Sequence, residues 1–379
     1  MTAPIVKGWC PGALRPMVSG DGLVVRVRPR AGRLSSEQAL GLAALSQRFG
    51  NGLIDLSSRA NVQLRGVSAD GSAALLDGLD SLGLLDTDAA AEARRNVIVA
   101  PFWREGDETQ VLAGQLGDAL VAAKALALPG KFGFAVDCGK VPVLTRDPAD
   151  IRIERDAAGG LILCADGHGA GLPVTVQSAV PEALELARWF LSRKGGARRM
   201  ATFMADGGGM PPGFDVPRQP PASPVVPHRT DAGALVALAF GQMSSETLAA
   251  LGALGPLRTT PWRMVLLEGQ RVAPALAELI QDGGDPLLRV IACTGAPRCM
   301  QALGETRALA RRLSPHVPEG AVLHVSGCAK GCAHPAPAEF VLRATAAGYD
   351  LIREGRADGD ARQRDLHPDN IPDIIEKAH

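Results

Sequence analysis

"GDGLVVRVRPRAGRLSSEQALGLAALSQRFGNGLIDLSSRANVQLRGV", residues 20–67, decides the fold because the chain contains a second version of it. The spacing of apolar residues predicts a strand over 23–27, a serine-capped helix over 35–48 and a strand at 62–64. The second version, "DAGALVALAFGQMSSETLAALGALGPLRTTPWRMVLLEG" at 231–269, has the same order of strand, "SSE" helix start and Arg-bearing segment. One such match could arise by chance, but the matching cap and the matching segment together favour an internal duplication.

A longer stretch of alternating strands and helices follows each copy. Strands are predicted at 94–102, 131–139, 150–156 and 160–167 in the first half, and at 287–295, 320–328 and 338–345 in the second. Helices are predicted at 110–127, 181–194 and 299–313. The chain is therefore expected to be a pseudo-symmetric α+β protein with a cleft between its repeats.

A proline-rich segment, "MPPGFDVPRQPPASPVVPHR" at 210–229, divides the halves. Because proline lacks an N–H and fixes φ, such a segment fits neither a central strand nor a helix interior and is expected to be a connector. The predicted division is a first half-repeat, an α/β domain without a metal cluster, a linker, a second half-repeat and a metal-binding α/β domain. These are residues 15–70, 90–205, 206–230, 231–270 and 285–379.

Composition limits the class of protein. The chain of 379 residues has 46% hydrophobic residues, and 40 basic residues balance 40 acidic ones. No uninterrupted apolar run suits a membrane span, and the first residues lack the apolar run of a secretory signal. Seven cysteines are too few and too scattered for a disulfide framework and favour reduced thiols. The cytoplasm is expected, with no membrane or nucleic-acid partner.

Charge is uneven along the chain. The first 66 residues carry nine Lys and Arg against three Asp and Glu. Such an excess is typical either of a surface that faces an anion or of a solvated face. Arg26 and Arg28 alternate on one predicted strand, so they could form no more than its solvent-facing side.

Four cysteines in the second half carry the strongest chemical signal: Cys293 and Cys299 in "CTGAPRC", then Cys328 and Cys332 in "GCAKGC". Each pair begins where a predicted strand ends, so neighbouring strands would bring the thiolates to one edge of a sheet. Four thiolates favour an iron–sulfur cluster or zinc, and zinc usually takes tighter spacings.

Gly295, Gly327 and Gly331 are expected to let the backbone approach the metal, and Cys299 is expected to open the helix at 299–313. Unrelated buried thiols are the remaining alternative, and Cys138 and Cys164 are expected to be of that kind, while Cys10 is left open.

These residues resemble the sulfite/nitrite reductase family. The cysteine spacing, "SRANVQLRG" (58–66), "RRNVIVAP" (94–101) and "LPGKF" (128–132) carry the resemblance. It implies a pseudo-twofold duplicated fold, with ferredoxin-like half-repeats and two α/β cluster-type domains around a central cleft. It also implies a [4Fe–4S] cluster on the four cysteines, with the last one bridging to a sirohaem. The family's two arginines and first lysine match Arg59, Arg95 and Lys131, but Gly133 stands where the second lysine is expected.

That departure and further motifs indicate one branch of the family. "GWCPGALRPMVSGDGLVVRVRP" (8–29), "LPGKFGFAVD" (128–137) and "HVSGCAKGCAHPAP" (324–337) are similar to the branch that acts in aerobic cobalamin biosynthesis. The resemblance implies an O2-dependent monooxygenase that hydroxylates precorrin-3A at C20 and forms a γ-lactone. It further implies a mononuclear non-haem iron in place of sirohaem, and a separate electron donor, either a ferredoxin or an NADH-dependent reductase.

Candidate site residues follow from the motifs and from the carboxylates of such a substrate. The catalytic candidates are Arg59, Asn61, Arg95 and Lys131, with Asn61 a candidate iron ligand. The candidates for binding substrate carboxylates are Arg15, Arg26, Arg28, Arg59, Gln63, Arg65, Arg95 and Lys131. His324 and His334 flank the cluster motif and are expected to be buried or hydrogen-bonded neighbours rather than ligands.

Two other functions remain open at this point. The first is a sirohaem-dependent, ferredoxin-type sulfite or nitrite reductase, against which Gly133 counts because a cation is missing. The second is a non-catalytic iron–sulfur electron-transfer protein, which would have no use for the basic residues of the first half.

Overall fold

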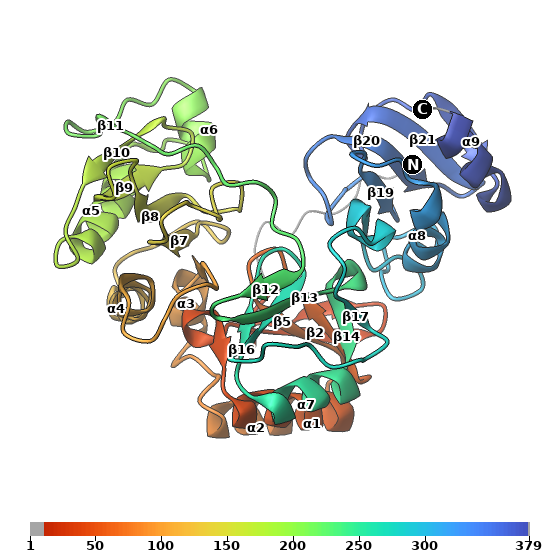
Figure 1. Ribbon diagram of the computed structural model, residues 1–379, viewed down its shortest axis with the longest axis horizontal. Coiled ribbons are helices and arrows are strands. Elements are labelled where there is room, and N and C mark those ends of the chain that lie inside the picture. Colours follow the sequence, from red (N-terminus) through yellow and green to blue (C-terminus); the bar gives the residue numbers. More distant parts are fainter. Residues whose placement is uncertain (1–10, 378–379) are drawn as a thin grey trace.

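The structure, a computed structural model, describes residues 11–377, and the strands within that range form four sheets. Two sheets and their helices make a base, and the other two form separate lobes on one side of it (Figure 1). One lobe belongs to the first half of the chain and the other to the second. The predicted duplicated α+β architecture is confirmed.

The base consists of two antiparallel sheets, each of which contains strands from both half-repeats. In order, the first contains β1 (Met17–Ser19), β2 (Gly22–Val27), β5 (Val62–Val67), β4 (Leu53–Leu56) and β14 (Gln242–Ser244). The second contains β12 (His228–Thr230), β13 (Gly233–Leu238), β16 (Met264–Glu268), β15 (Leu257–Thr259) and β3 (Arg33–Leu34), with β17 (Leu279–Ile280) beside β13. Strands β3 and β14 thus each pair with the sheet of the other repeat.

Short 3-10 turns in the two repeats show the duplication at the level of the backbone. Turn η1 (Arg30–Gly32) precedes β3 and turn η2 (Ala239–Gly241) precedes β14. The middle residue of each has a positive φ, 49° at Ala31 and 59° at Phe240. Such a conformation is uncommon outside glycine, so its recurrence at the same place in both repeats supports their common origin.

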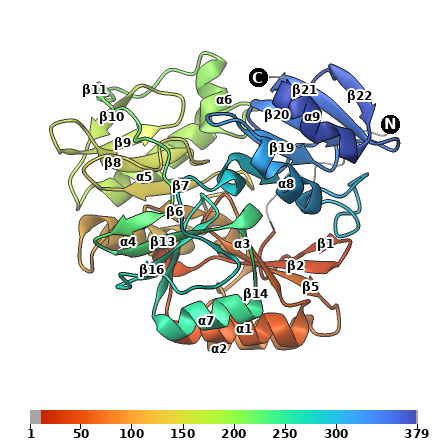
Figure 2. The same cartoon turned by 45° about the vertical axis from the view of Figure 1, so that its right-hand side comes forward.

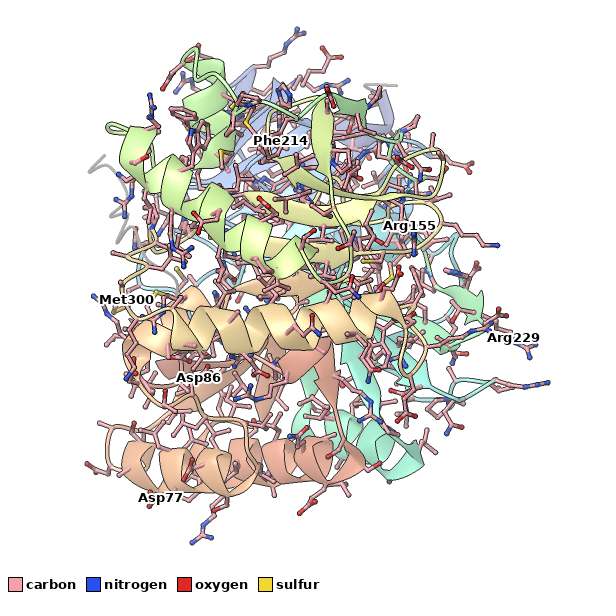
Figure 3. The ribbon with its side chains drawn as sticks, turned by 90° about the vertical axis from the view of Figure 1, so that its left-hand side faces the viewer. Asp77, Asp86, Arg155, Phe214, Arg229 and Met300 are labelled. Atoms are coloured by element: carbon pink, nitrogen blue, oxygen red, sulfur yellow. The ribbon has the colours of Figure 1, made fainter. Side chains whose placement is uncertain are left out.

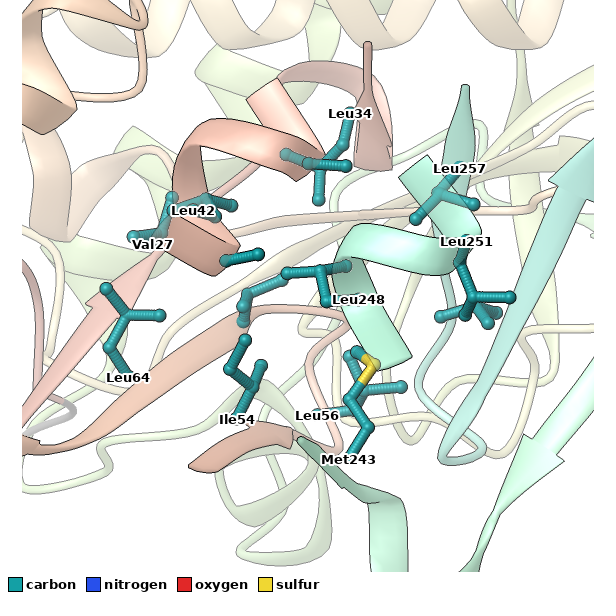
Figure 4. Close-up of a cluster of buried hydrophobic side chains, with 14 of the residues drawn as sticks. Val27, Leu34, Leu42, Ile54, Leu56, Leu64, Met243, Leu248, Leu251 and Leu257 are labelled. Atoms are coloured by element: carbon teal, nitrogen blue, oxygen red, sulfur yellow. The ribbon is translucent and has the colours of Figure 1, made fainter. Parts of the chain in front are cut away.

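Helices α1 (Ser36–Phe49), α2 (Ser72–Ser81) and α7 (Ser245–Leu254) lie side by side along the lower face of the base (Figure 2). The predicted caps are present: the Ser35 side chain accepts a hydrogen bond from the Gln38 N–H in a capping box, and Ser244 accepts one from Thr247. Side chains from both repeats meet in one core (Figure 4), including Val27, Leu34, Leu42, Ile54, Leu56, Leu64, Met243, Leu248, Leu251 and Leu257.

The two lobes share one strand topology. The first sheet runs β11 (Val216–Pro217), β10 (Ala170–Pro173), β9 (Leu161–Ala165), β8 (Ile151–Arg155), β7 (Phe134–Asp137) and β6 (Val97–Val99). The second runs β18 (Val290–Ala292), β19 (Leu323–Ser326), β20 (Ala338–Ala344), β21 (Tyr349–Gly355) and β22 (Gln363–Leu366). In each, three parallel strands come first along the chain and antiparallel strands follow.

Further helices cover these sheets or join them to the base. They are α3 (Ala89–Arg94), α4 (Glu108–Ala122), α5 (Ala179–Arg193), α6 (Met200–Ala205), α8 (Arg307–Leu313) and α9 (Ile371–Lys377), with the 3-10 turns η3 (Pro286–Arg289), η4 (Ser314–His316) and η5 (Pro368–Asn370). The prediction of a helix over 299–313 is wrong at its start, because α8 begins at Arg307. Cys299 therefore lies in a loop and does not open a helix.

The proline-rich segment crosses from the first lobe to the base. Its short strand β11 pairs only with β10, at the edge of the sheet, where a proline costs no ladder hydrogen bond. Just after it, the Arg218 guanidinium forms a 2.7 Å ion pair with the buried Glu154 carboxylate. The connector is thus fixed to the sheet that it leaves.

No helix within residues 11–377 is both long and apolar enough to cross a membrane. Cys10, whose role the sequence leaves open, lies outside the described residues.

Candidate functional site

The cysteines stand at the carboxyl ends of two parallel strands. Strand β18 leads directly to Cys293, and β19 leads through Gly327 to Cys328. The register pairs Ala292 with Val325, so the two strand ends lie side by side. The Gly327 N–H donates to the Cys293 sulfur across this junction, at 3.2 Å. The sequence prediction that adjacent strand ends bring these thiols to one edge of the sheet is therefore met by the backbone.

The cysteines of this group are close enough to one another for their hydrogen bonds and charges to shift the pKa values of Cys293, Cys328 and Cys332. A hydrogen bond between the Cys332 and Cys293 sulfurs lowers the pKa of Cys293 and raises that of Cys332. Burial and the negative charges of Cys293, Cys328 and Cys299 raise the pKa of Cys332 further. Burial also raises the pKa of Cys328. Four thiols that interact in this way form a single donor set.

The donor set suits a cluster of several metal ions. All four donors are cysteine sulfurs, the ligand type that a [4Fe–4S] cluster takes, with one thiolate on each of its four irons. The Gly327 N–H on a cysteine sulfur is the kind of hydrogen bond that tunes such clusters. Cys293, Cys299, Cys328 and Cys332 therefore fit the cluster that the family implies.

Two of the glycines between these cysteines have packing reasons of their own. A Cβ on Gly295, at a φ of 70°, would stand 2.5 Å from the Thr306 hydroxyl, which itself donates to the Cys293 carbonyl oxygen at 2.6 Å. A Cβ on Gly327 would stand 2.7 Å from the Ala302 Cβ. These glycines let the cysteine loops pack against each other.

His324 and His334 lie beside the cysteine loops with their rings 5.7 Å apart. His324 is fully buried on β19, and neither of its ring nitrogens has a hydrogen-bond partner among the described residues. Burial, with the nearby His334 and Arg263, lowers the pKa of His324 to about 4. Because burial also lowers the pKa of His334, both imidazoles are neutral at pH 7.

The second group of candidates surrounds the buried Arg59 side chain. Its Nη2 donates to the Lys131 carbonyl oxygen at 2.8 Å, and its Nη1 donates to the Pro148 carbonyl oxygen at 3.1 Å. Asn61 is also buried there, and its Nδ2 has no hydrogen-bond partner in the described part of the chain. The Lys131 side chain is exposed. The structure thus places the Arg59 guanidinium against the backbone of Lys131, with Asn61 buried two residues farther along the chain from Arg59.

The structure gives a packing reason for a glycine at position 133. A Cβ at this position would stand 2.7 Å from the Asn96 Nδ2 and 2.8 Å from the Arg59 Nη1. The space in which the family's second lysine would begin is therefore filled by an amide and a guanidinium group. This close packing accounts for the absence of a lysine at position 133.

Three of the other basic candidates, Arg28, Arg65 and Arg95, form ion pairs with carboxylates of the chain itself. Arg95 forms a buried two-point pair with Asp86, at 2.7 and 2.8 Å, and Asp86 lies below α4 in the view of Figure 3. Arg28 lies 3.2 Å from the Glu92 carboxylate, and Arg65 contacts both Asp21 and Asp55. Arg26 is hydrogen-bonded to Gln63, and Arg15 is exposed. Much of the basic excess of the first 66 residues is neutralised within the fold.

Sequence reasoning missed the carboxylates because Asp86 and Glu92 lie beyond the basic stretch. It also missed Asp147, which follows β7 in a loop next to the Arg59 contact at Pro148. The Trp262 indole N–H donates to Asp147 at 3.1 Å, and burial raises the pKa of that carboxyl to about 7. The one available signal was the repeat alignment, in which Trp262 and Arg59 occupy the same loop of their half-repeats.

A cavity of about 1060 Å³ lies elsewhere, at the carboxyl ends of β6 and β7. Phe102, Trp103, Asp137, Cys138, Arg155 and Asp231 are among the residues that line it. None of the predicted substrate-binding residues lines this cavity. It occupies, in the first lobe, the place that the cysteines occupy in the second.

Comparison with known proteins agrees with this geometry. The model of the nitrite/sulfite reductase ferredoxin-like half domain matches residues 15–82. A precorrin-3B synthase from Sinorhizobium sp is 29% identical, over 94% of this chain and 85% of the relative. Residues 15–82 therefore resemble the nitrite/sulfite reductase ferredoxin-like half domain, and nearly the whole chain is similar to a precorrin-3B synthase.

Other relatives carry the same family signal. A ferredoxin–nitrite reductase from Synechococcus elongatus is 32% identical over 33% of this chain and 26% of its own length. The solved structure of the Mycobacterium tuberculosis NirA protein covers 93% of this chain and 79% of its own, with a TM-score of 0.68 and 20% sequence identity. That likeness establishes the shared fold.

Proposed function

We propose that this protein is a precorrin-3B synthase. It would hydroxylate precorrin-3A at C20 with O2 and form the γ-lactone from the ring A acetate, as a step of aerobic cobalamin biosynthesis. In this reaction one atom of O2 enters the substrate, and the other leaves as water with two electrons and two protons. A separate ferredoxin or NADH-dependent reductase would supply the electrons.

The packing around Gly133 is the observation that carries the proposal. A sulfite or nitrite reductase of this family needs a cation here, and a lysine at Gly133 would displace the Asn96 amide and the Arg59 guanidinium, which stand 2.7 and 2.8 Å from the position of its Cβ. The extent of similarity to the Sinorhizobium precorrin-3B synthase, over 94% of the chain, points to the same function.

The roles of the residues follow from their contacts. Cys293, Cys299, Cys328 and Cys332 would hold the [4Fe–4S] cluster. When bound, such a cluster supplies electrons one at a time. Arg59 is held in a fixed direction by two backbone carbonyl oxygens and, with the exposed Lys131, would bind substrate carboxylates. Arg95 and Arg28 form ion pairs with Asp86 and Glu92, so they would have a structural role near the site and would not bind the substrate directly.

A mononuclear non-haem iron is a separate question. In the described residues, Asn61 has no group of His, Cys, Asp or Glu around it that would complete the ligands of an iron. We therefore assign only the cluster to named residues. Iron analysis of the purified protein would decide the matter, because a fifth iron per chain would reveal a mononuclear site.

The decisive experiment is anaerobic purification with iron and sulfide analysis, followed by incubation with precorrin-3A and an electron donor under 18O2. The expected product contains one 18O atom, and reactions under 16O2 and without O2 serve as controls. Sirohaem absorption bands with sulfite or nitrite reduction would overturn the proposal in favour of a reductase. A cluster-containing protein that consumes no O2 with precorrin-3A would be an electron-transfer protein. A colourless protein that contains zinc would refute the assignment of an iron–sulfur cluster.

A further inference from the structure

The tip of the first hairpin, residues 19–22 between β1 and β2, touches the loop that precedes Cys299. The Gly20 N–H donates to the Arg298 carbonyl oxygen at 2.9 Å. The Ser19 hydroxyl donates to the same oxygen at 2.7 Å. Two donors from the start of the chain thus converge on the peptide group that joins Arg298 to Cys299.

The contact is too close for any side chain at Gly20. A Cβ there would stand 2.4 Å from the Pro297 carbonyl oxygen and 3.0 Å from the Arg298 carbonyl carbon. Both atoms belong to the backbone, so they cannot swing aside as the end of a side chain can. The hairpin tip and the Cys299 loop therefore fit together as two backbones in direct contact.

The hairpin tip is itself anchored from below by Arg65 on β5. The Arg65 guanidinium donates to both Asp21 oxygens, at 2.8 and 3.0 Å, and its Nη2 also donates to the Ser19 hydroxyl at 3.2 Å. Arg65 is only 4% exposed, which shields these pairs from solvent. The Ser19 hydroxyl thus accepts a hydrogen bond from the buried Arg65 guanidinium and donates one to the Cys299 loop.

The same network reaches the other end of that loop. The Arg65 Nη1 lies 3.3 Å from Asp55 on β4, and Asp55 accepts a hydrogen bond from Arg307 at 3.1 Å. Arg307 is the first residue of α8, where the loop after Cys299 ends. The base therefore contacts the segment 298–307 at both of its ends through Arg65 and its partners.

We propose that the hairpin tip and Arg65 are positioning elements that hold the Cys299 loop in the conformation that binds the cluster. The presence of a cluster rests on the proposed function. The contacts of the hairpin tip and Arg65 with the Cys299 loop, called the clamp below, exist in the protein without a cluster. Within its own loop, the Cys299 backbone is held by a single N–H bond to the Gly295 carbonyl oxygen and by the Ala302 N–H on its own carbonyl. Arg65, a predicted substrate-binding residue, then acts through Ser19 on a ligand loop in the other half of the chain.

The test compares Gly20→Ala and Ser19→Ala with the matched control Gly114→Ala. Gly114 lies within α4, and a Cβ there would meet nothing within 4 Å. In cluster-free protein, the rate of alkylation by iodoacetamide is measured at each cysteine by peptide mass spectrometry. Because Ser19→Ala removes one of the two hydrogen bonds from the hairpin tip to the Arg298 carbonyl oxygen, together with the bond that Ser19 accepts from Arg65, the rate at Cys299 is expected to rise about fivefold. Gly20→Ala is expected to raise it more, and Cys328 serves as an internal reference.

After reconstitution with iron and sulfide, the lifetime of the cluster absorbance in air is expected to shorten in the same order. Equal Cys299 alkylation in both variants, the control and the parent protein would overturn the clamp. A uniform rise at Cys299 and Cys328 would overturn it too, because it would show general loosening. If Gly20→Ala does not fold, Ser19→Ala alone decides. Failure of the parent protein to take up a cluster would count against the proposed function and would leave the alkylation result valid.

Discussion

The two lobes have one topology and opposite chemistry at the same place. In the first lobe β6, β7 and β8 are parallel and β9 is antiparallel, and β18, β19, β20 and β21 repeat this order in the second. The carboxyl ends of β18 and β19 present the cysteine set. The corresponding ends of β6 and β7 open into the 1060 Å³ cavity. The fold makes neighbouring strand ends converge in both lobes, and the residues that follow each strand decide what is built there.

A cysteine occurs at this edge in both lobes but behaves in opposite ways. Cys138 directly follows β7, and burial raises its pKa to about 12. Cys293 directly follows β18, and hydrogen bonds from Cys332 and from the Gly327 N–H lower its pKa. A thiol becomes a metal ligand when polar donors and other thiols surround it, and it stays an inert apolar group when they do not.

The largest expected difference between the two lobes is in the effect of replacing a cysteine by serine. Cys328→Ser should abolish the cluster absorbance and most of the bound iron, because a cubane iron loses its thiolate. Cys138→Ser, the matched change in the first lobe, should keep both. Iron analysis and the visible spectrum measure the effect, and full retention of iron in Cys328→Ser would refute the ligand assignment.

The Arg59 group should affect turnover without affecting the cluster. Arg59→Ala is expected to lower the rate of precorrin-3A hydroxylation on the order of a hundredfold, because a buried, oriented cation is lost. The cluster spectrum should not change. Arg188→Ala on the exposed face of α5 is the control, since its ion pair with Glu185 is solvated. Unchanged kinetics in Arg59→Ala would remove this residue from the substrate site.

The packing at Gly133 predicts a smaller effect on stability. Gly133→Ala should cost about 1–3 kcal/mol of unfolding free energy, because the new Cβ presses on the Asn96 amide and the Arg59 guanidinium. Gly169→Ala, where a Cβ would meet nothing within 4 Å, is the control. Denaturant unfolding measures both, and equal stability of the two variants would contradict the close packing at Gly133.

The buried carboxyls of the first lobe predict the smallest effect, a dependence of stability on pH. Burial raises the pKa of Asp147 to about 7 and that of Asp137 to about 6. A carboxyl with a raised pKa stabilises the fold while it is protonated, so this stability is present below about pH 4 and is lost as pH rises through 6 and 7. Asp147→Asn should reduce the fall in melting temperature between pH 6 and pH 8 by on the order of 2 °C. An unchanged slope would show that Asp147 ionises normally.

Much of the architecture could be read from local patterns. The caps at Ser35 and Ser244, the strands on either side of α1 and α7, and the cysteines at the strand ends all lie where the sequence predicts them. Each depends on neighbours within a few residues, which is why periodicity and capping residues reveal it. The strand predicted over 287–295 begins only at Val290, because residues 286–289 form the 3-10 turn η3. The start of α8 at Arg307 was also missed, because the loop after Cys299 has apolar residues at helical spacing.

The sequence by itself determined the duplication, the order of strands and helices, and the four cysteines at the strand ends. Only the tertiary structure decided that β3 and β14 exchange between the half-repeats, that Asp86 neutralises Arg95, and that Gly20 touches the peptide before Cys299. The physical reason is distance along the chain. Periodic patterns record contacts within one element, whereas a hydrogen bond between residues 20 and 298 leaves no mark on the residues next to either.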